Sequence, residues 1–187
     1  MAYIEVIGHE NADGELKEIY DNLVKSRGKL AEVHKIQSLN PKSIVNHMDL
    51  YMTIMFGKSP LKRVQREIIA VVVSKNNNCE YCQTHHGEAV NAYWKNDEKV
   101  EVLKNNFREI DLSEIDFNLC VLAENLTKNP NWNKQKKHLD LLKDLGLNDR
   151  AILDATLVIS YFNFVNRMVL GLGVQLEAHK GAGFIYD

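Results

Sequence analysis

The sequence lacks a long apolar run, an excess of charge of one sign, internal repeats and low-complexity tracts. Its longest apolar runs, such as 68–73, are far too short to cross a bilayer, and no charged-then-apolar secretion signal opens the chain. The formal net charge of −2 provides no electrostatic footprint for nucleic acid or an anionic membrane. We therefore expect a cytoplasmic protein that binds neither nucleic acid nor membranes.

The composition is that of a globular protein. Hydrophobic residues make up 45% of the 187 residues, enough to bury a substantial core. Apolar residues recur at helical spacing, and we find no convincing strand near the cysteines. The sequence predicts an all-α fold, a single-domain helical bundle over 1–187. We expect an N-terminal helical extension at 1–40, a core at 41–177 and a tail at 178–187, flexible or an oligomer arm.

Caps and helix-breaking residues set the expected helix boundaries. Ser59 is expected to cap a helix whose first residue is Pro60, and Asn129-Pro130 to end another. The remaining boundaries follow from Gly28, Asn40-Pro41 and Gly146. The expected helices cover about 13–26, 29–39, 41–56, 60–75, 79–94, 97–105, 113–128, 134–145 and 149–177.

The most informative stretch contains two of the three cysteines. Cys79 and Cys82 form a Cys-x-x-Cys pair, His86 follows four residues later, and Glu67 stands twelve residues before the first cysteine. The asparagine triplet 76–78 predicts a turn that ends in a helix N-cap, with the helix starting at about residue 79. Because residues three and four apart are neighbours on a helix, both cysteines and the histidine share one face.

This arrangement predicts reactive thiols. A helix N-terminus favours an anion, and a neighbouring histidine can take the thiol proton or stabilise the thiolate. Glu67 lies at the edge of an apolar stripe and needs a polar partner, so it could relay a proton to His86 or hold its ring. Two thiols one turn apart can also close a disulfide if the local geometry allows it. In a reducing compartment such a pair is catalytic or metal-binding rather than structural.

The motif has four other possible interpretations. Attachment of c-type haem needs histidine directly after the second cysteine, where Gln83 stands, and a thioredoxin-like site needs a βαβ setting. A zinc site could use Cys79, Cys82 and His86 with Glu67 or His85 as fourth ligand, although structural zinc sites usually draw on two motifs. The thiols could also be incidental to a helical oligomerisation or binding module.

Several other polar and soft residues have two possible roles. We expect Cys120 to be a buried core thiol, and His34 and His47 to be surface or hydrogen-bonded core residues. His85 points about 100° away from the cysteine face, so a direct role is not favoured. A methionine-rich face at 44–55 is expected to be core or a pocket wall. Asn163, Asn166 and Arg167 share a helix face that we expect to contact another subunit or line the pocket.

The spacing from Glu67 through the two cysteines to His86 resembles the active-site signature of the alkylhydroperoxidase D-like proteins of the carboxymuconolactone decarboxylase superfamily. The segment Asn-Cys-x-Tyr-Cys at 78–82 is similar to the peroxidase-related branch. So are YFNFVNR at 161–167 and Gly-Leu-Gly-Val at 171–174. The resemblance covers most of the chain from about residue 40. One departure is Tyr81, where the best-known members have histidine.

The resemblance implies an all-helical fold whose subunits associate, often as trimers or hexamers. It implies a thiol-dependent peroxidase that needs no cofactor and reduces hydrogen peroxide or organic hydroperoxides. Cys82 would attack the peroxide, Cys79 would resolve the oxidised form as a disulfide, and Glu67 and His86 would relay protons. An external dithiol, lipoyl- or thioredoxin-like, would restore the thiols. The alternative is a zinc-binding or redox-sensing helical oligomer without efficient turnover. Ring-opening decarboxylation is disfavoured, since members with that activity generally lack the cysteine pair.

Overall fold

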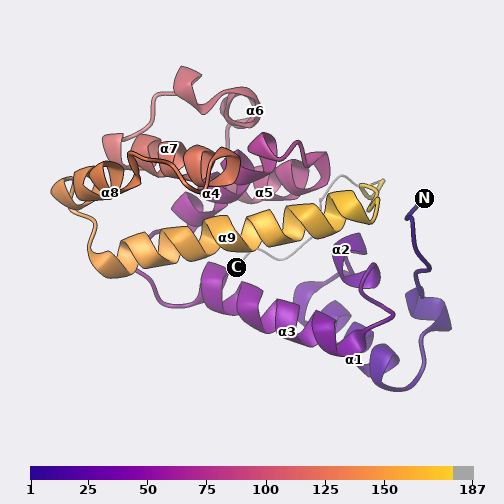
Figure 1. The fold of residues 1–187 in the computed structure, drawn as a ribbon. Coiled ribbons are helices and arrows are strands. Elements are labelled where there is room, and N and C mark those ends of the chain that lie inside the picture. The colour runs from indigo at the N-terminus through magenta and orange to yellow at the C-terminus, as the bar shows by residue number, and fades with distance from the viewer. Residues whose placement is uncertain (179–187) are drawn as a thin grey trace.

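The computed structural model describes residues 1–178, which form helices and no strand (Figure 1). The all-α prediction is confirmed. The predicted tail at 178–187 lies, except for its first residue, outside the described residues. No helix in the described part is long and apolar enough to span a membrane. The helices are α1 (Gly14–Arg27), α2 (Glu32–Lys35), α3 (Pro41–Tyr51), α4 (Arg63–Asn76), α5 (Glu80–Trp94), α6 (Asp97–Asn105), α7 (Glu114–Lys128), α8 (Gln135–Asp144) and α9 (Asp149–Gly171).

Helix α4 forms the centre of the bundle. It packs against α5, α6, α7 and α9, and every residue from 66 to 74 is buried. A helix that is buried all round belongs in the middle of a core, which explains why its sequence is an almost unbroken apolar run. The long helix α9 lies across the molecule, with α4, α5 and α7 on one side and α1 to α3 on the other (Figure 1). The bundle therefore places the cysteine segment, at the α4–α5 junction, deep inside.

The N-terminal segment has a small core of its own. Helix α1 packs on α3 through Leu16, Tyr20, Leu23 and Ile44, all buried and separate from the main cluster. Gly28 ends α1 in the left-handed conformation, as its position predicts. The chain then turns into α2, so that the end of α1 and the start of α2 face the cysteine segment.

Three predicted helix boundaries are wrong, and tertiary contacts explain them. Ser59 does not cap a helix: its hydroxyl donates to Asp154 Oδ2 (2.5 Å) and accepts from the backbone N–H of Leu61 (3.1 Å), and α4 begins only at Arg63. The helix expected at 29–39 shortens to the single turn α2, followed by further turns. Helix α9 ends at Gly171 rather than near residue 177, because Gly173 turns the chain with a φ of +67°.

The asparagine turn between α4 and α5 is held by α9. Asn78 adopts a left-handed φ of +56°, as the sequence predicts. The Asn77 side chain donates to both Asn163 Oδ1 and Asn166 Oδ1 at 3.0 Å, and Asn166 donates to Ser74 Oγ at 3.2 Å. Neither asparagine lines the cavity, so that part of the expectation is wrong, while the contact with another subunit stays a prediction. Within the chain, both fix the turn.

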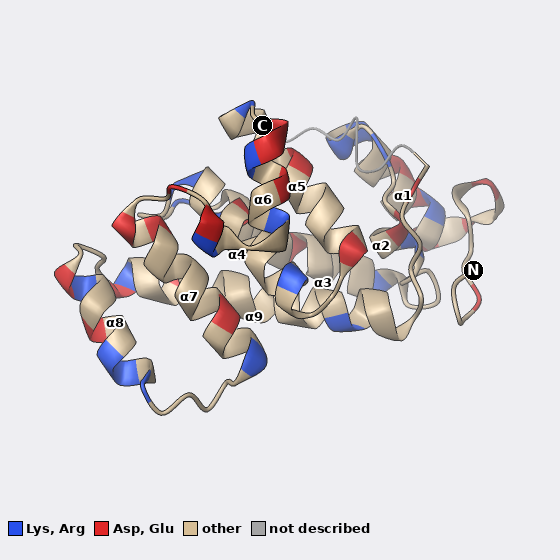
Figure 2. Ribbon diagram, turned by 90° about the horizontal axis from the view of Figure 1, so that it is seen from above, with Lys and Arg blue, Asp and Glu red and all other residues tan. Residues whose placement is uncertain are grey.

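Charged residues of both signs are interspersed along the helices (Figure 2). Many pair at helical spacing, as Lys136 does with Asp140 and Lys17 with Asp21. Exposed pairs of this kind contribute about 0–1 kcal/mol each, so they keep the protein soluble more than they fix its fold.

Arg66 is the exception, because it is a buried cation that holds backbone together. Its Nη1 donates to the carbonyls of Ile54 (3.1 Å), Met55 (2.8 Å) and Gly57 (3.0 Å), and its Nη2 to that of Leu61 (3.0 Å). These carbonyls belong to a π-helical turn after α3 and to the loop before α4. One side chain thus joins the end of α3 to α4.

Replacing Arg66 by Met should destabilise the protein by at least about 3 kcal/mol, because several buried carbonyls lose their donor at once. Urea unfolding monitored by circular dichroism measures this. Arg108→Met is the matched control: it removes an arginine paired with Glu124 at the surface, and should cost less than about 1 kcal/mol. Equal losses in the two variants would contradict the structural role of Arg66.

Candidate active site

The two cysteines of the motif lie at the start of α5. The helix starts at Glu80, one residue after the predicted start, and Cys82 is in its first turn. The predicted asparagine N-cap is wrong, because the N-cap residue is Cys79, whose side chain makes no cap hydrogen bond. The two sulfurs are 2.8 Å apart and both thiols are free, since a disulfide bond would measure about 2.05 Å. Both are buried, but only Cys82 lines the adjoining cavity. Cys82 is therefore the sulfur that a molecule in this cavity meets first.

The two thiols share a proton. The hydrogen bond between them lowers the pKa of Cys79 and raises the pKa of Cys82, and burial pushes both upward. A hydrogen bond from Asn166 works the other way on Cys82 and lowers its pKa. Since the sulfurs are in contact, the two ionisations belong to the pair: the first is made easier and the second harder. The first thiolate is therefore stabilised by the hydrogen bond between the two sulfurs.

Glu67 and His86, distant in sequence, are in direct contact. Glu67 Oε2 lies 2.6 Å from His86 Nδ1, and Glu67 Oε1 accepts from Arg63 Nε at 2.9 Å and from Arg63 Nη2. The Glu67 side chain is only 1% exposed, far more buried than its predicted place at the edge of a stripe. The His86 ring also packs edge-on against Phe162, with centroids 4.4 Å apart. These contacts fix the ring and leave Nε2 free of Glu67.

Glu67 stays ionised in spite of its burial. Burial alone would raise its pKa, but the charge and hydrogen bond of His86, together with Arg63, hold the pKa below its usual value. A buried carboxylate is stable only when it is paired in this way. The carboxylate is thus fixed as an acceptor that orients the imidazole.

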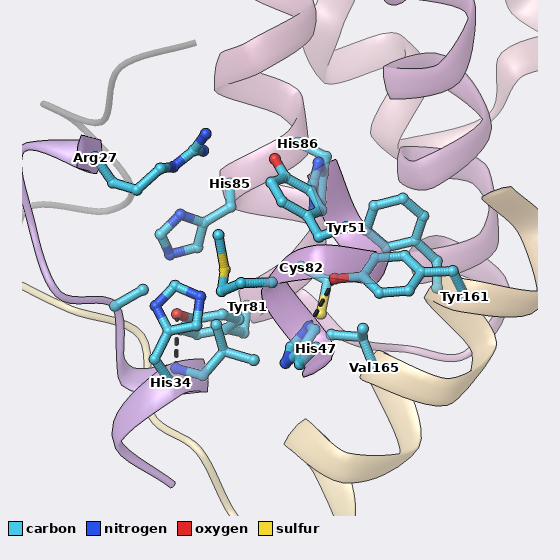
Figure 3. Close-up of a pocket in the computed structure, with 14 residues that line it drawn as sticks. Arg27, His34, His47, Tyr51, Tyr81, Cys82, His85, His86, Tyr161 and Val165 are labelled. Carbon is cyan, nitrogen blue, oxygen red and sulfur yellow. Dashed lines mark hydrogen bonds between the residues drawn. The ribbon is translucent and has the colours of Figure 1, made fainter. Parts of the chain in front are cut away.

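A cavity of about 90 Å³ opens over Cys82 (Figure 3). His86 and Tyr81 line it together with Cys82, and the predicted pocket wall of α3 is present as Met48 and Tyr51. Residues from α1, α2, α3, α5 and α9 all contribute to its walls. The other lining residues are Arg27, Ala31, Val33, His34, His47, His85, Tyr161, Phe162 and Val165.

His34 and His47 are both cavity residues rather than surface residues. His47 is fully hydrogen-bonded, with Nδ1 2.8 Å from Gln37 Nε2 and Nε2 2.6 Å from Tyr161 Oη. His34 is buried, yet its Nδ1 has no hydrogen-bond partner among the described residues. Burial lowers the pKa of His34 to about 3 and that of His47 to about 4, so both rings are neutral at pH 7.

A second histidine–carboxylate pair adjoins the cavity. His85 Nε2 lies 2.8 Å from Glu177 Oε2, and Tyr81 Oη donates to Glu177 Oε1 at 2.9 Å. Glu177 also accepts from the backbone N–H of Glu32 at 3.0 Å. Burial would raise the pKa of Glu177, but its hydrogen bonds bring it down to about 2. His85, which does not share the cysteine face, is thus tied to the residues after α9.

The zinc site weighed from the sequence is not assembled. Within residues 1–178, no three His, Cys, Asp or Glu side chains converge in a way that could hold a metal ion. Glu67 and His86 bind each other, and His85 binds Glu177. The third cysteine, Cys120, is fully buried in the core, as predicted, and burial raises its pKa.

Sequence reasoning missed several residues of this site. Arg63 precedes Glu67 by four residues, so the ion pair could have been found from helical spacing. No local signal pointed to Tyr161, which meets His47 across 114 positions, or to Glu177, which lies 92 positions from His85. These contacts depend on how α9 crosses the bundle.

Known proteins share both the sequence around this site and the fold that holds it. The Carboxymuconolactone decarboxylase family matches residues 46–106, the part of the chain that contains Glu67, both cysteines and His86. An uncharacterized peroxidase-related protein from Silicibacter sp. TM1040 superposes with a TM-score of 0.84 and 27% identity, over 94% of this chain and 92% of that one. The family match and this superposition support placing the chain in the carboxymuconolactone decarboxylase superfamily.

Two further solved structures share the fold at lower sequence identity. An alkylhydroperoxidase AhpD core protein, also peroxidase-related and uncharacterized, comes from Ralstonia eutropha JMP134. It has a TM-score of 0.85 and 18% identity over 96% of this chain and 94% of that one. The debrominase Bmp8, solved as a variant with 2,3,4-tribromopyrrole, has a TM-score of 0.78 and 20% identity over 97% of each chain. No protein of curated function matches this sequence. A protein named as a debrominase thus shares this fold.

The shared proton predicts a pH dependence. In the wild type one thiolate is present above the lowered pKa and is lost as the pH falls through it. Cys79→Ala leaves a single buried thiol whose ionisation no partner sulfur eases, so at neutral pH alkylation by iodoacetamide should slow by roughly tenfold or more. Mass spectrometry at several pH values measures the rate. Cys120→Ala is the control and should leave the alkylation rate unchanged. If Cys79→Ala were alkylated as fast as the wild type, the shared proton would be contradicted.

Proposed function

We propose that the protein is a thiol-dependent peroxidase that reduces hydrogen peroxide or organic hydroperoxides through a disulfide cycle. The observation that carries the proposal is the pair of free thiols, 2.8 Å apart, at a cavity that Cys82 shares with His86. A dithiol able to close a disulfide, an oriented histidine and space for a substrate are what such a reaction requires. The relatives named as peroxidase-related support the same conclusion.

In the proposed mechanism, the proton of Cys82 passes to Cys79 or to His86, whose ring Glu67 holds. The Cys82 thiolate attacks the terminal peroxide oxygen, the O–O bond breaks, and the leaving alkoxide or hydroxide takes a proton to become an alcohol or water. Cys82 is now a sulfenic acid. Cys79 attacks its sulfur, water leaves, and the disulfide has taken up the two oxidising equivalents of the peroxide.

The cycle closes by thiol–disulfide exchange. We propose an external dithiol, lipoyl- or thioredoxin-like, as reductant, since exchange needs only access to the sulfur that lines the cavity. No cofactor enters the proposed cycle. The three free cysteines agree with the reducing, cytoplasmic location that we propose for the protein. We also propose one alkylhydroperoxidase D-like domain, with residues 1–40 as its extension.

Reductive dehalogenation is a second candidate, favoured by one observation. The cavity of about 90 Å³ has room for an organic molecule, and the debrominase of the same fold was solved with a tribrominated pyrrole. A dithiol can reduce a carbon–bromine bond to carbon–hydrogen, with a disulfide, bromide and a proton as the other products. Bromide release from 2,3,4-tribromopyrrole, without thiol loss on addition of peroxide, would favour this reaction over the peroxidase.

The first test is a thiol count on the reduced protein before and after one equivalent of hydrogen peroxide, with intact mass. We expect two thiols to disappear and the mass to fall by about two hydrogens, the signature of a Cys79–Cys82 disulfide. Cys82→Ser should abolish turnover, and Cys79→Ser should be oxidised once and then stall. Cys120→Ser is the control and should turn over normally. Normal turnover by Cys79→Ser with a monothiol reductant would refute its resolving role.

We further propose that the protein is a homo-oligomer, a trimer or hexamer. Exposed apolar side chains on α3 and α9, Leu50, Leu153, Leu157 and Phe164, lie on helices that contact each other through His47 and Tyr161. Light scattering should give three or six times the chain mass of 21.4 kDa. Phe164→Glu should shift this toward the monomer, whereas Tyr93→Glu, an exposed aromatic on α5, should not. A monomeric wild type would overturn the proposal.

A further inference from the structure

Two polar side chains of the cavity have no part in the proposed peroxide chemistry. Arg27, at the end of α1, and His34, in α2, both line the cavity above Cys82 (Figure 3). Both come from the N-terminal extension, outside residues 46–106 that match the family. Figure 3 shows them on the side of the cavity opposite Tyr161 and Val165. We therefore ask which kind of molecule could bind against this wall of the cavity.

His34 has a ring nitrogen without a hydrogen-bond partner, buried in the wall of the cavity. Its side chain makes no hydrogen bond within residues 1–178, and Nδ1 is buried without a partner. The residue is 9% exposed, and a buried polar atom left unsatisfied costs about 1–3 kcal/mol. Its neighbour His47, 6.0 Å away between ring centroids, has both nitrogens bonded. An oxygen of a bound molecule would supply the partner that His34 lacks.

Arg27 offers a positive charge at the same wall. It forms no ion pair with any carboxylate in the described part of the chain. Its guanidinium instead lies over the rings of Tyr51 (5.4 Å) and Phe56 (5.2 Å), which hold it at the cavity. The carboxylates near the cavity are already committed, Glu67 to Arg63 and His86, and Glu177 to His85 and Tyr81. An arginine in this position favours a carboxylate with two oxygens to accept its forked donors.

The rest of the cavity fits an organic body. Ala31, Val33, Met48, Phe162 and Val165 contribute apolar surface. A volume of about 90 Å³ has room for roughly six or more waters at about 10–15 Å³ each, far more than the two oxygens of hydrogen peroxide fill. An apolar wall with few polar groups is typical of a site for a small organic molecule.

We propose that the cavity binds an organic hydroperoxide that carries a carboxylate, with the carboxylate at Arg27 and His34 and the hydroperoxide at Cys82. The inference rests on the proposed peroxidase function and adds its substrate class. The reaction is the one described above: the O–O bond breaks, Cys82 takes the terminal oxygen, and the substrate leaves as an alcohol that keeps its carboxylate.

The kinetic test compares cumene hydroperoxide with its para-carboxylate. Wild type should use the carboxylate with a kcat/KM about tenfold or more higher, and Arg27→Met should lose that preference, as expected for one charge-assisted hydrogen bond. Lys25→Met, which removes an exposed lysine from the same helix, is the matched control and should keep the preference. His34→Leu should reduce it and His34→Gln should largely preserve it. Equal use of both peroxides by wild type would overturn the proposal.

A binding test separates this inference from the peroxidase proposal. Calorimetry with 4-isopropylbenzoate, which has the carboxylate but no peroxide, should show binding to wild type and to Lys25→Met, and at least about tenfold weaker binding to Arg27→Met. Isopropylbenzene, the neutral analogue, should bind wild type and Arg27→Met with the same affinity. If wild type binds 4-isopropylbenzoate but reduces no peroxide, the peroxidase proposal is refuted and the proposed carboxylate site still holds. Failure of wild type to bind the carboxylate would overturn the anion site alone.

Discussion

A carboxylate in the middle of an apolar helix must be neutralised where it lies. Glu67 is in the most buried stretch of α4, and taking an ionised group out of water costs several kcal/mol unless it is paired. Arg63 supplies one partner from the same helix and His86 the other from α5. Because the pair spans two helices, it fixes the position of α5 against α4. The proposed catalytic stripe depends on it, since His86 shares a helix face with Cys82 one turn before.

The buried pair of Glu67 and His86 matters more for the proposed chemistry than for stability. A buried ion pair is weak support for stability, since an apolar pair of similar volume often does as well. What Glu67 gives is an oriented imidazole, whose ring is held by the carboxylate on one side and by Phe162 on the other. The thiols need no such cation, because the hydrogen bond between their sulfurs already stabilises the first thiolate. The proton relay and the dithiol are thus stabilised independently.

Local patterns predicted the motif, and tertiary contacts decided the rest. The asparagine turn, the start of α5 and the contact of Glu67 with His86 follow from spacing, caps and the need of a buried carboxylate for a partner. The cap predicted at Ser59 is wrong: α4 begins only at Arg63, and the Ser59 hydroxyl binds Asp154, 95 positions away. Asn163 looked like a surface or pocket residue because its partner in the turn, Asn77, is 86 positions distant. The hydrophobic pattern gives each helix its face, but it does not say which polar groups meet across that face.

The cavity is built from two parts of the chain. Its reacting groups come from α4 and α5, within the segment that matches the family, and one of its walls comes from α1 and α2, outside it. The N-terminal segment packs on α3 through a small core of its own, so its side chains can change without disturbing α4. Arg27 and His34 also lie apart from the hydrogen bonds that hold Glu67 and His86. A fold built this way can keep one dithiol while different N-terminal walls select different organic molecules, which is consistent with enzymes of more than one reaction sharing it.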